Sequence, residues 1–539
     1  MGIEDQFPSH FPLASRYIET CHGMGMGFLA CGTSLYGVGC LMKSRKPFLF
    51  LTLLACLSLT SCYHEFPAGG GGGTGTGTAS VSLVLVSDTL PANIGIISLR
   101  VAISSVVLTS STGTTSTLNA GNLTVDLARA QSDSIFLGTI PGVPTGTNSS
   151  IALHITGGEI AFFNGTGVAL TNPACPVNGV CVASFSASSV PTITSSQTIS
   201  ANTGFGIDFN LSNVVTVTGT TLTVNLTNSG NTNVVTSFAL PRATSLATGQ
   251  LDLIEDFTGV VTLSGTNVTV ASQTQAGRGS ITAAVTSTTE LDIDPSQQLC
   301  TAAQQGTPST CVSNNQIVSM DAILNSDGTF TAQELEPLLA TPVVDTIEGT
   351  IVNISSPTQF SVVTSDIVAA ASGSKIGSLS MGDPVTVNLS NNIVTGGFLV
   401  DTKGLAVGGA LGNFQGGTGT GTLFVGQTVS FPVSSFTAAN GTTAAIANNV
   451  NLVTLRWSRF ISTVGSNPNI LEFNITAIPG YFGFTPASLF DVQTFTNTNL
   501  DLPAAGLVAS APVGIRALYL QNNTNTADPA FFAAKVRQH

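Results

Sequence analysis

The sequence predicts an all-β protein, and three observations support this fold class. Charged residues make up only 8% of the 539 residues and hydrophobic residues 42%, a balance that excludes long charged helices and charged disordered chains. From Ser80 onward, apolar and polar residues alternate in short runs such as 80–85 and 221–226, separated by Gly, Asn and Thr. This alternation is typical of short strands joined by tight turns. No window shows helical periodicity over more than a turn or two.

The charge balance restricts the class of partner. Lysine and arginine number 15 against 28 aspartate and glutamate residues, which gives a formal net charge of -13. A nucleic-acid partner requires a basic surface that contacts phosphates, so we expect no nucleic-acid binding.

Residues 42–61 have the layout of a secretory signal peptide. A basic cluster at 43–46 precedes the apolar run 47–60, which is shorter than the roughly 20 residues needed to span a bilayer. The segment 59–62, Leu-Thr-Ser-Cys, resembles the bacterial lipobox, in which signal peptidase cuts before a lipid-modified cysteine. The resemblance implies that acyl chains on Cys62 anchor the protein to a membrane. A plain signal peptide with an incidental cysteine is the alternative.

The residues on either side of this signal also carry information. We interpret residues 1–41 as an upstream extension, because Met42 stands where a signal peptide should start; a genuine long leader is the alternative. Tyr63 occupies the position where Asp retains many Gram-negative lipoproteins at the inner membrane, which favours the outer membrane or cell surface. Residues 62–79 then form the lipidated cysteine and a Gly/Thr-rich tether, a composition typical of flexible chain.

Four cysteines follow the tether, and their spacing predicts two local disulfides. Cys175 with Cys181, and Cys300 with Cys311, each close a short loop containing Pro, Asn or Gly. Such pairs are expected in a protein exported to an oxidising compartment. A four-cysteine zinc site is the competing interpretation, but these separations differ from the usual Cys-x-x-Cys spacing.

Residues 80–244 contain four short motifs that resemble one bacterial family, domain of unknown function 4382. The motifs are Leu-Val-Ser-Asp-Thr-Leu-Pro at 85–91, Thr-Val-Asp-Leu at 124–127, Gly-Ile-Asp-Phe-Asn at 206–210 and Phe-Ala-Leu-Pro-Arg at 238–242. The resemblance implies an immunoglobulin- or transthyretin-like β-sandwich without an assigned activity. The motif residues Asp88, Asp126 and Asp208 could line a cation site, but capping of turns is the commoner role for such residues.

Beyond residue 245 the sequence repeats itself, which predicts three small β-barrel or sandwich modules at 245–340, 341–445 and 446–539. A predicted strand pair at 316–332 is similar to one at 514–533, and the strand end before each, at 288–292 and at 497–501, is also similar. Two further strands, at 381–387 and 425–431, share a Gly-x-x-Val start. These pieces resemble a second uncharacterised family, small β-barrel domains that occur in tandem in exported bacterial proteins. We expect the Gly-rich stretch 408–422 to be an internal loop.

The search for chemistry finds no catalytic constellation, metal site or cofactor motif. His154 lies in a predicted strand, and neither a Gly-x-Ser-x-Gly nor a His-Glu-x-x-His motif is present. The Asn-Ser-Asp-Gly run at 325–328 lacks a first calcium ligand and predicts a hairpin turn. The acidic cluster of Asp252, Glu255 and Asp256 could bind a divalent cation weakly, or it could be a solvated strand end.

The aromatic side chains with a polar group gather in the last predicted module. Trp457, Tyr481 and Tyr519 all follow residue 445, and Arg456 and Arg459 lie beside the tryptophan. If any module binds a glycan or peptide, we expect Trp457 and Tyr481 to act as stacking platforms, assisted by the two arginines. The alternative is that these rings pack a barrel core.

These features predict a non-enzymatic, lipid-anchored cell-envelope protein of a Gram-negative bacterium. Its tandem β domains would serve in adhesion, ligand binding or structure, with a glycan or an envelope protein as partner. The alternatives are a carbohydrate-active enzyme built on a carboxylate pair and an accessory subunit of an envelope assembly.

Overall fold

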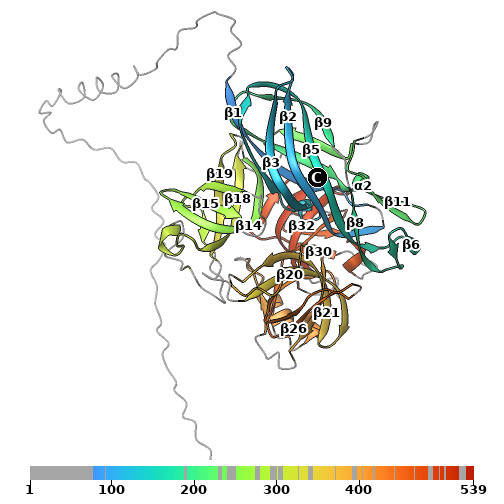
Figure 1. Cartoon of the computed structure of the whole chain (residues 1–539). Helices are drawn as coiled ribbons and strands as arrows, with labels where there is room; N and C mark the ends of the chain where they lie inside the picture. The colour runs from blue at the N-terminus through green and yellow to red at the C-terminus, as the bar shows by residue number, and fades with distance from the viewer. Residues whose placement is uncertain are drawn as a thin grey trace, which may run out of the picture. The chain divides into compact units, whose positions relative to one another are not determined.

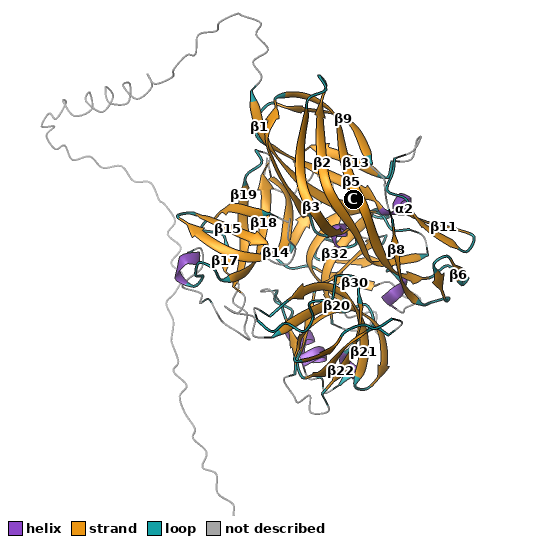
Figure 2. Cartoon of the chain, in the orientation of Figure 1, coloured by secondary structure: helices purple, strands orange, loops and turns teal. Residues whose placement is uncertain are grey.

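The computed structural model describes residues 77–538, except for short segments within that range. The excepted residues are 92, 187–190, 229–232, 240–249, 273–278, 292–299, 301–306, 326, 338–343, 371, 391–396, 403–404, 416, 418, 442, 467, 483–489, 497, 503–505 and 521–529. The signal segment, Cys62 and most of the tether therefore lie outside the described residues. Strands dominate the described chain, and its α-helices, α2 (Leu211–Val214) and α3 (Gly412–Gln415), have four residues each (Figure 2). The predicted all-β class is confirmed.

The first domain is a β-sandwich whose two sheets enclose one apolar core. One sheet has the order β13-β10-β1-β4 and contains β1 (Thr78–Asp88), β4 (Ile135–Pro144), β10 (Thr203–Asn210) and β13 (Val235–Ala239). The other has the order β3-β2-β5-β8, with β9 also on β5, and contains β2 (Ile94–Ser110), β3 (Thr115–Asp126), β5 (Gly146–Asn164), β8 (Val180–Phe185) and β9 (Thr192–Ile199). Two small sheets and one turn of 3₁₀ helix complete the domain: β6 (Leu170–Thr171) with β7 (Ala174–Cys175), β11 (Val215–Thr218) with β12 (Thr221–Val224), and η1 (Arg129–Gln131).

Strand β1 is buried on both of its faces. Val81, Leu83 and Leu85 point into the sandwich core, as the alternation predicts. Val84, on the opposite face, belongs with Phe136 to the apolar core of the module that follows. A strand that is covered on both faces reads as a nearly continuous apolar run, and this strand does so.

Module 1, the strands from Gln250 to Pro337, closes into a five-stranded barrel. Each strand pairs with the next one in the order β14, β15, β16, β19, β18, and β18 also pairs with β14, which closes the barrel. The barrel lies in the yellow-green part of the chain in Figure 1. The elements are β14 (Gln250–Ser264), β15 (Asn267–Ser272), β16 (Ser280–Ala284), β17 (Glu290–Leu291), η3 (Pro308–Thr310), β18 (Ile317–Asn325) and β19 (Phe330–Pro337). The predicted hairpin turn at 325–328 joins β18 to β19, and Gly328 has the positive φ of 78° that favours glycine there.

Module 2, the strands from Asp345 to Arg456, has the strand order β23-β27-β24-β20-β21-β22-β26-β25. Its strands are β20 (Asp345–Ser356), β21 (Gln359–Val368), β22 (Pro384–Leu389), β23 (Phe398–Val400), β24 (Thr428–Val433), β25 (Ser435–Thr437), β26 (Ala445–Val450) and β27 (Val453–Arg456). The predicted boundary at residue 445 falls on the first residue of β26. The Gly-rich stretch predicted as a loop contains short helical turns: η4 (Gly408–Leu411), α3 and η5 (Thr420–Thr422).

Module 3, the strands from Ser458 to Gln538, has the order β28-β32-β33-β30-β29, with β31 also on β33. An isolated β-bridge between Val464 and Ile475 also connects the end of the module's first strand, β28, to its second strand, β29. The elements are β28 (Ser458–Thr463), β29 (Glu472–Ile475), η6 (Gly480–Phe482), β30 (Phe490–Gln493), β31 (Asn499–Asp501), β32 (Pro512–Tyr519) and β33 (Phe531–Gln538).

Modules 1 and 3 share one topology down to a single irregularity. In both, the last strand pairs antiparallel with the strand before it and parallel with two earlier strands. In both, a register shift interrupts the final hairpin at the same place, between Asp321 and Ala322 in module 1 and between Arg516 and Ala517 in module 3. Asp321 and Arg516 are therefore equivalent positions of the two modules.

None of the helices among the described residues has the length and apolar character needed to span a membrane.

Candidate functional site

The aromatic residues predicted as stacking platforms are buried. Trp457, between β27 and β28, is 1% exposed and belongs to the core of module 2. Tyr481 in η6 and Tyr519 in β32 lie in the core of module 3, and burial raises the pKa of both hydroxyl groups. The prediction that Trp457 and Tyr481 present rings to a ligand is wrong, because no ring face reaches solvent.

The rings of Trp457 and Tyr519 instead fill the joint between modules 2 and 3. The Tyr519 ring lies 5.6 Å from that of Phe424 in module 2 and 4.9 Å from that of Phe531 in its own module. Leu518 and Phe532 of module 3 belong to the same buried cluster as Trp457. The sequence carried a signal for this burial, because Trp457 continues the phase of Val453 and Leu455, which also face the core.

The two arginines beside the tryptophan are engaged by carboxylates. Arg456 Nε lies 3.1 Å from Glu348 Oε2, and its Nη1 donates to Asp401. Arg459 Nη1 lies 3.8 Å from the other oxygen of Glu348. Arg459 Nε donates to Asp133 Oδ2 at 2.6 Å. The structure thus brings the predicted pair Arg456 and Arg459 together, around Glu348 rather than around a ligand.

Asp133 is the centre of a junction between the sandwich and modules 2 and 3. It follows η1 and is 2% exposed. Besides Arg459 of module 3, its carboxylate faces Arg129 of the sandwich at 3.7 Å, and Arg129 in turn lies 3.7 Å from Asp366 of module 2. The Asp133 carbonyl accepts a hydrogen bond from Arg537 of module 3 at 3.1 Å. Sequence reasoning did not identify this junction, because its members are hundreds of residues apart.

A second cluster joins the sandwich to module 2. Arg100 Nη2 donates to Glu159 on the neighbouring strand and lies 3.6 Å from Asp383 Oδ1 of module 2. Burial raises the pKa of Asp383, and Glu159 raises it further, whereas the Ser380 N–H and Arg100 oppose that shift. The two carboxylates share one guanidinium, an arrangement that serves ion pairing.

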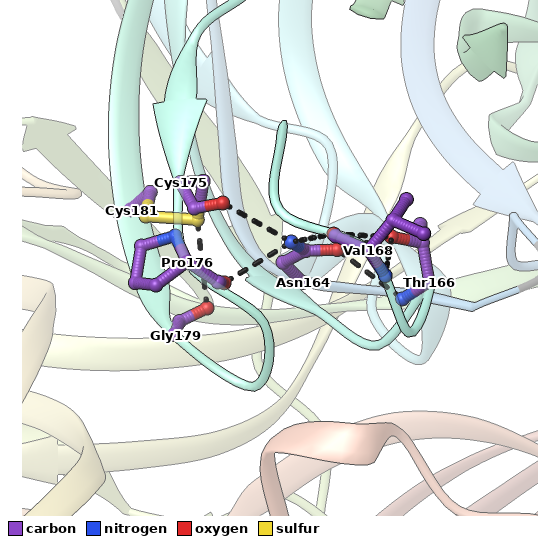
Figure 3. The surroundings of a disulfide bond; sticks show 7 residues. All are labelled: Asn164, Thr166, Val168, Cys175, Pro176, Gly179 and Cys181. Carbon is purple, nitrogen blue, oxygen red and sulfur yellow. Dashed lines mark hydrogen bonds between the residues drawn. A yellow bond between two sulfur atoms is a disulfide. The ribbon is translucent and has the colours of Figure 1, made fainter. Parts of the chain in front are cut away.

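Both predicted disulfides are present. Cys175 and Cys181 join with Cα atoms 5.8 Å apart, and Cys300 and Cys311 with Cα atoms 5.4 Å apart. Figure 3 shows the first bond beside Asn164, whose amide donates to the carbonyls of Cys175, Pro176 and Val168. The bond and this amide together fix the loop against the end of β5.

The aspartates of the family-like motifs have structural contacts. Asp126 accepts hydrogen bonds from the Ser98 hydroxyl and from the N–H groups of Leu99 and Ala128, all within 3.0 Å. This is the turn-capping role that we considered the commoner one. Asp88 accepts a bond from the neighbouring Thr89 at 3.5 Å. Within the described ranges, no three His, Cys, Asp or Glu side chains come together as a metal site would require.

No protein-family model matches this chain, and no curated protein matches it. The resemblances to the two uncharacterised bacterial families therefore stay predictions.

Proposed function

We propose that the protein is a non-enzymatic, lipid-anchored cell-envelope protein, held at the outer membrane or cell surface through Cys62, whose tandem β domains serve in adhesion, ligand binding or structure. The signal segment at 42–61 and the tether at 62–79 support the anchoring. The two disulfides fit the oxidising compartment that such a protein occupies.

The observation that carries the structural part of this proposal is that the sandwich contacts all three modules through buried or partly buried side chains. Phe136 packs its ring against Phe257 and Phe330 of module 1. Arg100 reaches Asp383 of module 2, and Asp133 reaches Arg459 of module 3. Buried apolar and ionic contacts between domains favour a body that holds its parts in place over one whose domains move around a reaction.

An accessory subunit of an envelope assembly is a second candidate, favoured by one surface feature. Val168, Val177 and Val182 lie around the Cys175–Cys181 disulfide and are 48%, 42% and 37% exposed. Exposed apolar side chains on and beside a cross-linked loop suit a protein contact. Such a contact would place the partner on the sandwich rather than on module 3.

The test uses the mature protein extracted from membranes. It is screened against a hydrolase substrate panel and envelope glycans, and its neighbours are cross-linked in cells. Binding or cross-linking without turnover agrees with the proposal, whereas turnover of any substrate by the purified protein refutes the non-enzymatic role. Replacing Val168, Val177 and Val182 with Ser should abolish a cross-link that depends on the apolar surface. The matched control is Leu471→Ser, because Leu471 is 65% exposed and belongs to module 3 rather than to the sandwich.

A further inference from the structure

We propose that module 3 is an intramolecular clamp, which holds the sandwich, module 1 and module 2 together through three buried arginines. Arg459, Arg516 and Arg537 have side-chain exposures of 8%, 3% and 1%. Each of them contacts residues outside module 3, and between them the three arginines reach the sandwich, module 1 and module 2.

Arg459 connects module 3 to two bodies at once. Its Nε donates to Asp133 of the sandwich, and its Nη1 faces Glu348 of module 2. Guanidinium groups suit such a position because their planar fork of donors can serve two carboxylates while keeping its charge.

Arg537 ties the last strand of the chain to the sandwich. Nη1 donates to the Asp133 carbonyl and Nη2 to the Ser134 hydroxyl at 3.0 Å, while Nε pairs with Asp501 of its own module at 3.2 Å. Asp501 balances the charge, which leaves the other two nitrogens to bind neutral groups of the sandwich. This contact cannot form until the last strand has been made.

Arg516 connects module 3 to module 1. Its Nη1 lies 4.0 Å from Asp321 Oδ2, and its guanidinium carbon lies 5.7 Å from the centre of the Trp457 ring. Trp457 is part of the module 2 core, so the arginine lies against two modules. A cation above a buried ring gains further electrostatic stabilisation.

Asp321 and Arg516 each have a cross-strand partner of like charge within their own module. Asp321 lies opposite Glu334 in module 1, and Arg516 lies opposite Lys535 in module 3. Like charges directly opposite one another destabilise a strand pair. The acidic pair and the basic pair occupy equivalent positions, and the Asp321–Arg516 contact joins them, so opposite charges meet between the two modules.

The experiment compares full-length variants in which an arginine becomes methionine, which keeps most of the side-chain length. Arg459→Met and Arg516→Met remove clamp contacts. Arg456→Met is the matched control, because Arg456 pairs with Glu348 and Asp401, which both belong to its own module 2. The readouts are calorimetric unfolding and hydrogen–deuterium exchange of peptides covering 129–136 and 317–325.

For the clamp, we expect the wild type and Arg456→Met to unfold in a single transition. Arg459→Met should raise exchange at 129–136, and Arg516→Met at 317–325, by about tenfold, with unfolding split into separate transitions. An unchanged exchange pattern in both clamp variants overturns the proposal, and so does equal splitting in Arg456→Met. If Arg516→Met fails to fold, Asp321→Asn removes the same contact from the side of module 1: raised exchange at 512–519 in module 3 supports the clamp, and unchanged exchange there overturns it.

Discussion

Arg459 and Asp133 are 326 residues apart in the sequence, yet Arg459 Nε lies 2.6 Å from Asp133 Oδ2 and both side chains are buried. Burying an ion pair costs desolvation energy, so the pair contributes less to stability than to the choice of one arrangement. Removing one partner is different, because the remaining charge is then buried without compensation.

Replacement of Asp133 by Asn should therefore destabilise the protein by about 3–5 kcal/mol. The control is Asp366→Asn, because Asp366 is more exposed than Asp133 and lies 3.7 Å from Arg129; its loss should therefore be smaller, closer to the about 0–1 kcal/mol of a surface pair. Urea denaturation of both variants checks the difference. Equal losses in the two variants would show that burial of Asp133 has no special role.

The single tryptophan allows a direct optical test of the corrected aromatic prediction. Trp457 is the only Trp in the chain, and its burial predicts blue-shifted emission that acrylamide and iodide quench poorly in the native state. Trp457→Ala should cost about 3–5 kcal/mol through the cavity it leaves. Trp457→Phe should cost much less, because the buried indole N–H has no hydrogen-bond partner among the residues that the structure describes, so its removal is favourable. Strong quenching of the native emission would show that the Trp457 ring is exposed to solvent, as a stacking platform requires.

Two aspartates of module 2 should give opposite pH dependences. Burial raises the pKa of Asp383 above its ordinary value of 3.8, so its stabilising effect is full at acid pH and is lost as the pH rises through the raised pKa. Burial acts on Asp345 in the same direction, but the N–H groups of Ala370 and Lys375 outweigh it and lower the pKa. The ionised Asp345 carboxylate therefore stabilises the fold at neutral pH, and this stabilisation is lost in acid.

The free energy of unfolding of wild type, Asp383→Asn and Asp345→Asn, measured by denaturation from about pH 3 to pH 7, separates the two cases. With rising pH the wild type should lose stability relative to Asp383→Asn and gain it relative to Asp345→Asn. Parallel curves for the two variants would contradict this assignment.

Loss of either disulfide should cost about 2–3 kcal/mol, because loops of 6 and 11 residues gain limited freedom in the unfolded chain. The paired variants Cys175→Ser with Cys181→Ser, and Cys300→Ser with Cys311→Ser, are compared with wild type by denaturation without reductant. Peptide mapping of exported protein under non-reducing conditions gives the independent check. Free thiols at these positions would contradict both the pairing and the oxidising compartment.

Local patterns in the sequence were sufficient for the strands and the repeats. Period-two alternation marks strands because side chains alternate across a sheet, and the similarity of 316–332 to 514–533 reflects the shared final hairpin of modules 1 and 3. Cysteine spacing was sufficient for the disulfides, because the loops they close are local.

The junctions between modules could not be predicted in the same way. Whether Arg459 contacts a ligand or Asp133 depends on how the sandwich and the modules pack against one another. A local hydrophobic pattern carries no information on this packing. For Trp457 the sequence left two interpretations, a stacking platform and a core ring, and the core interpretation, which agrees with the phase of Val453 and Leu455, is the one that the structure shows.

The most direct test of the proposed function is metabolic labelling with a fatty-acid analogue, followed by fractionation of the envelope. We predict that the wild-type protein carries the label and sediments with membranes, and that Cys62→Ala is unlabelled and is either released or kept as an uncleaved precursor. Wild-type protein that is exported but carries no label would contradict the lipid anchor on which the proposed function rests.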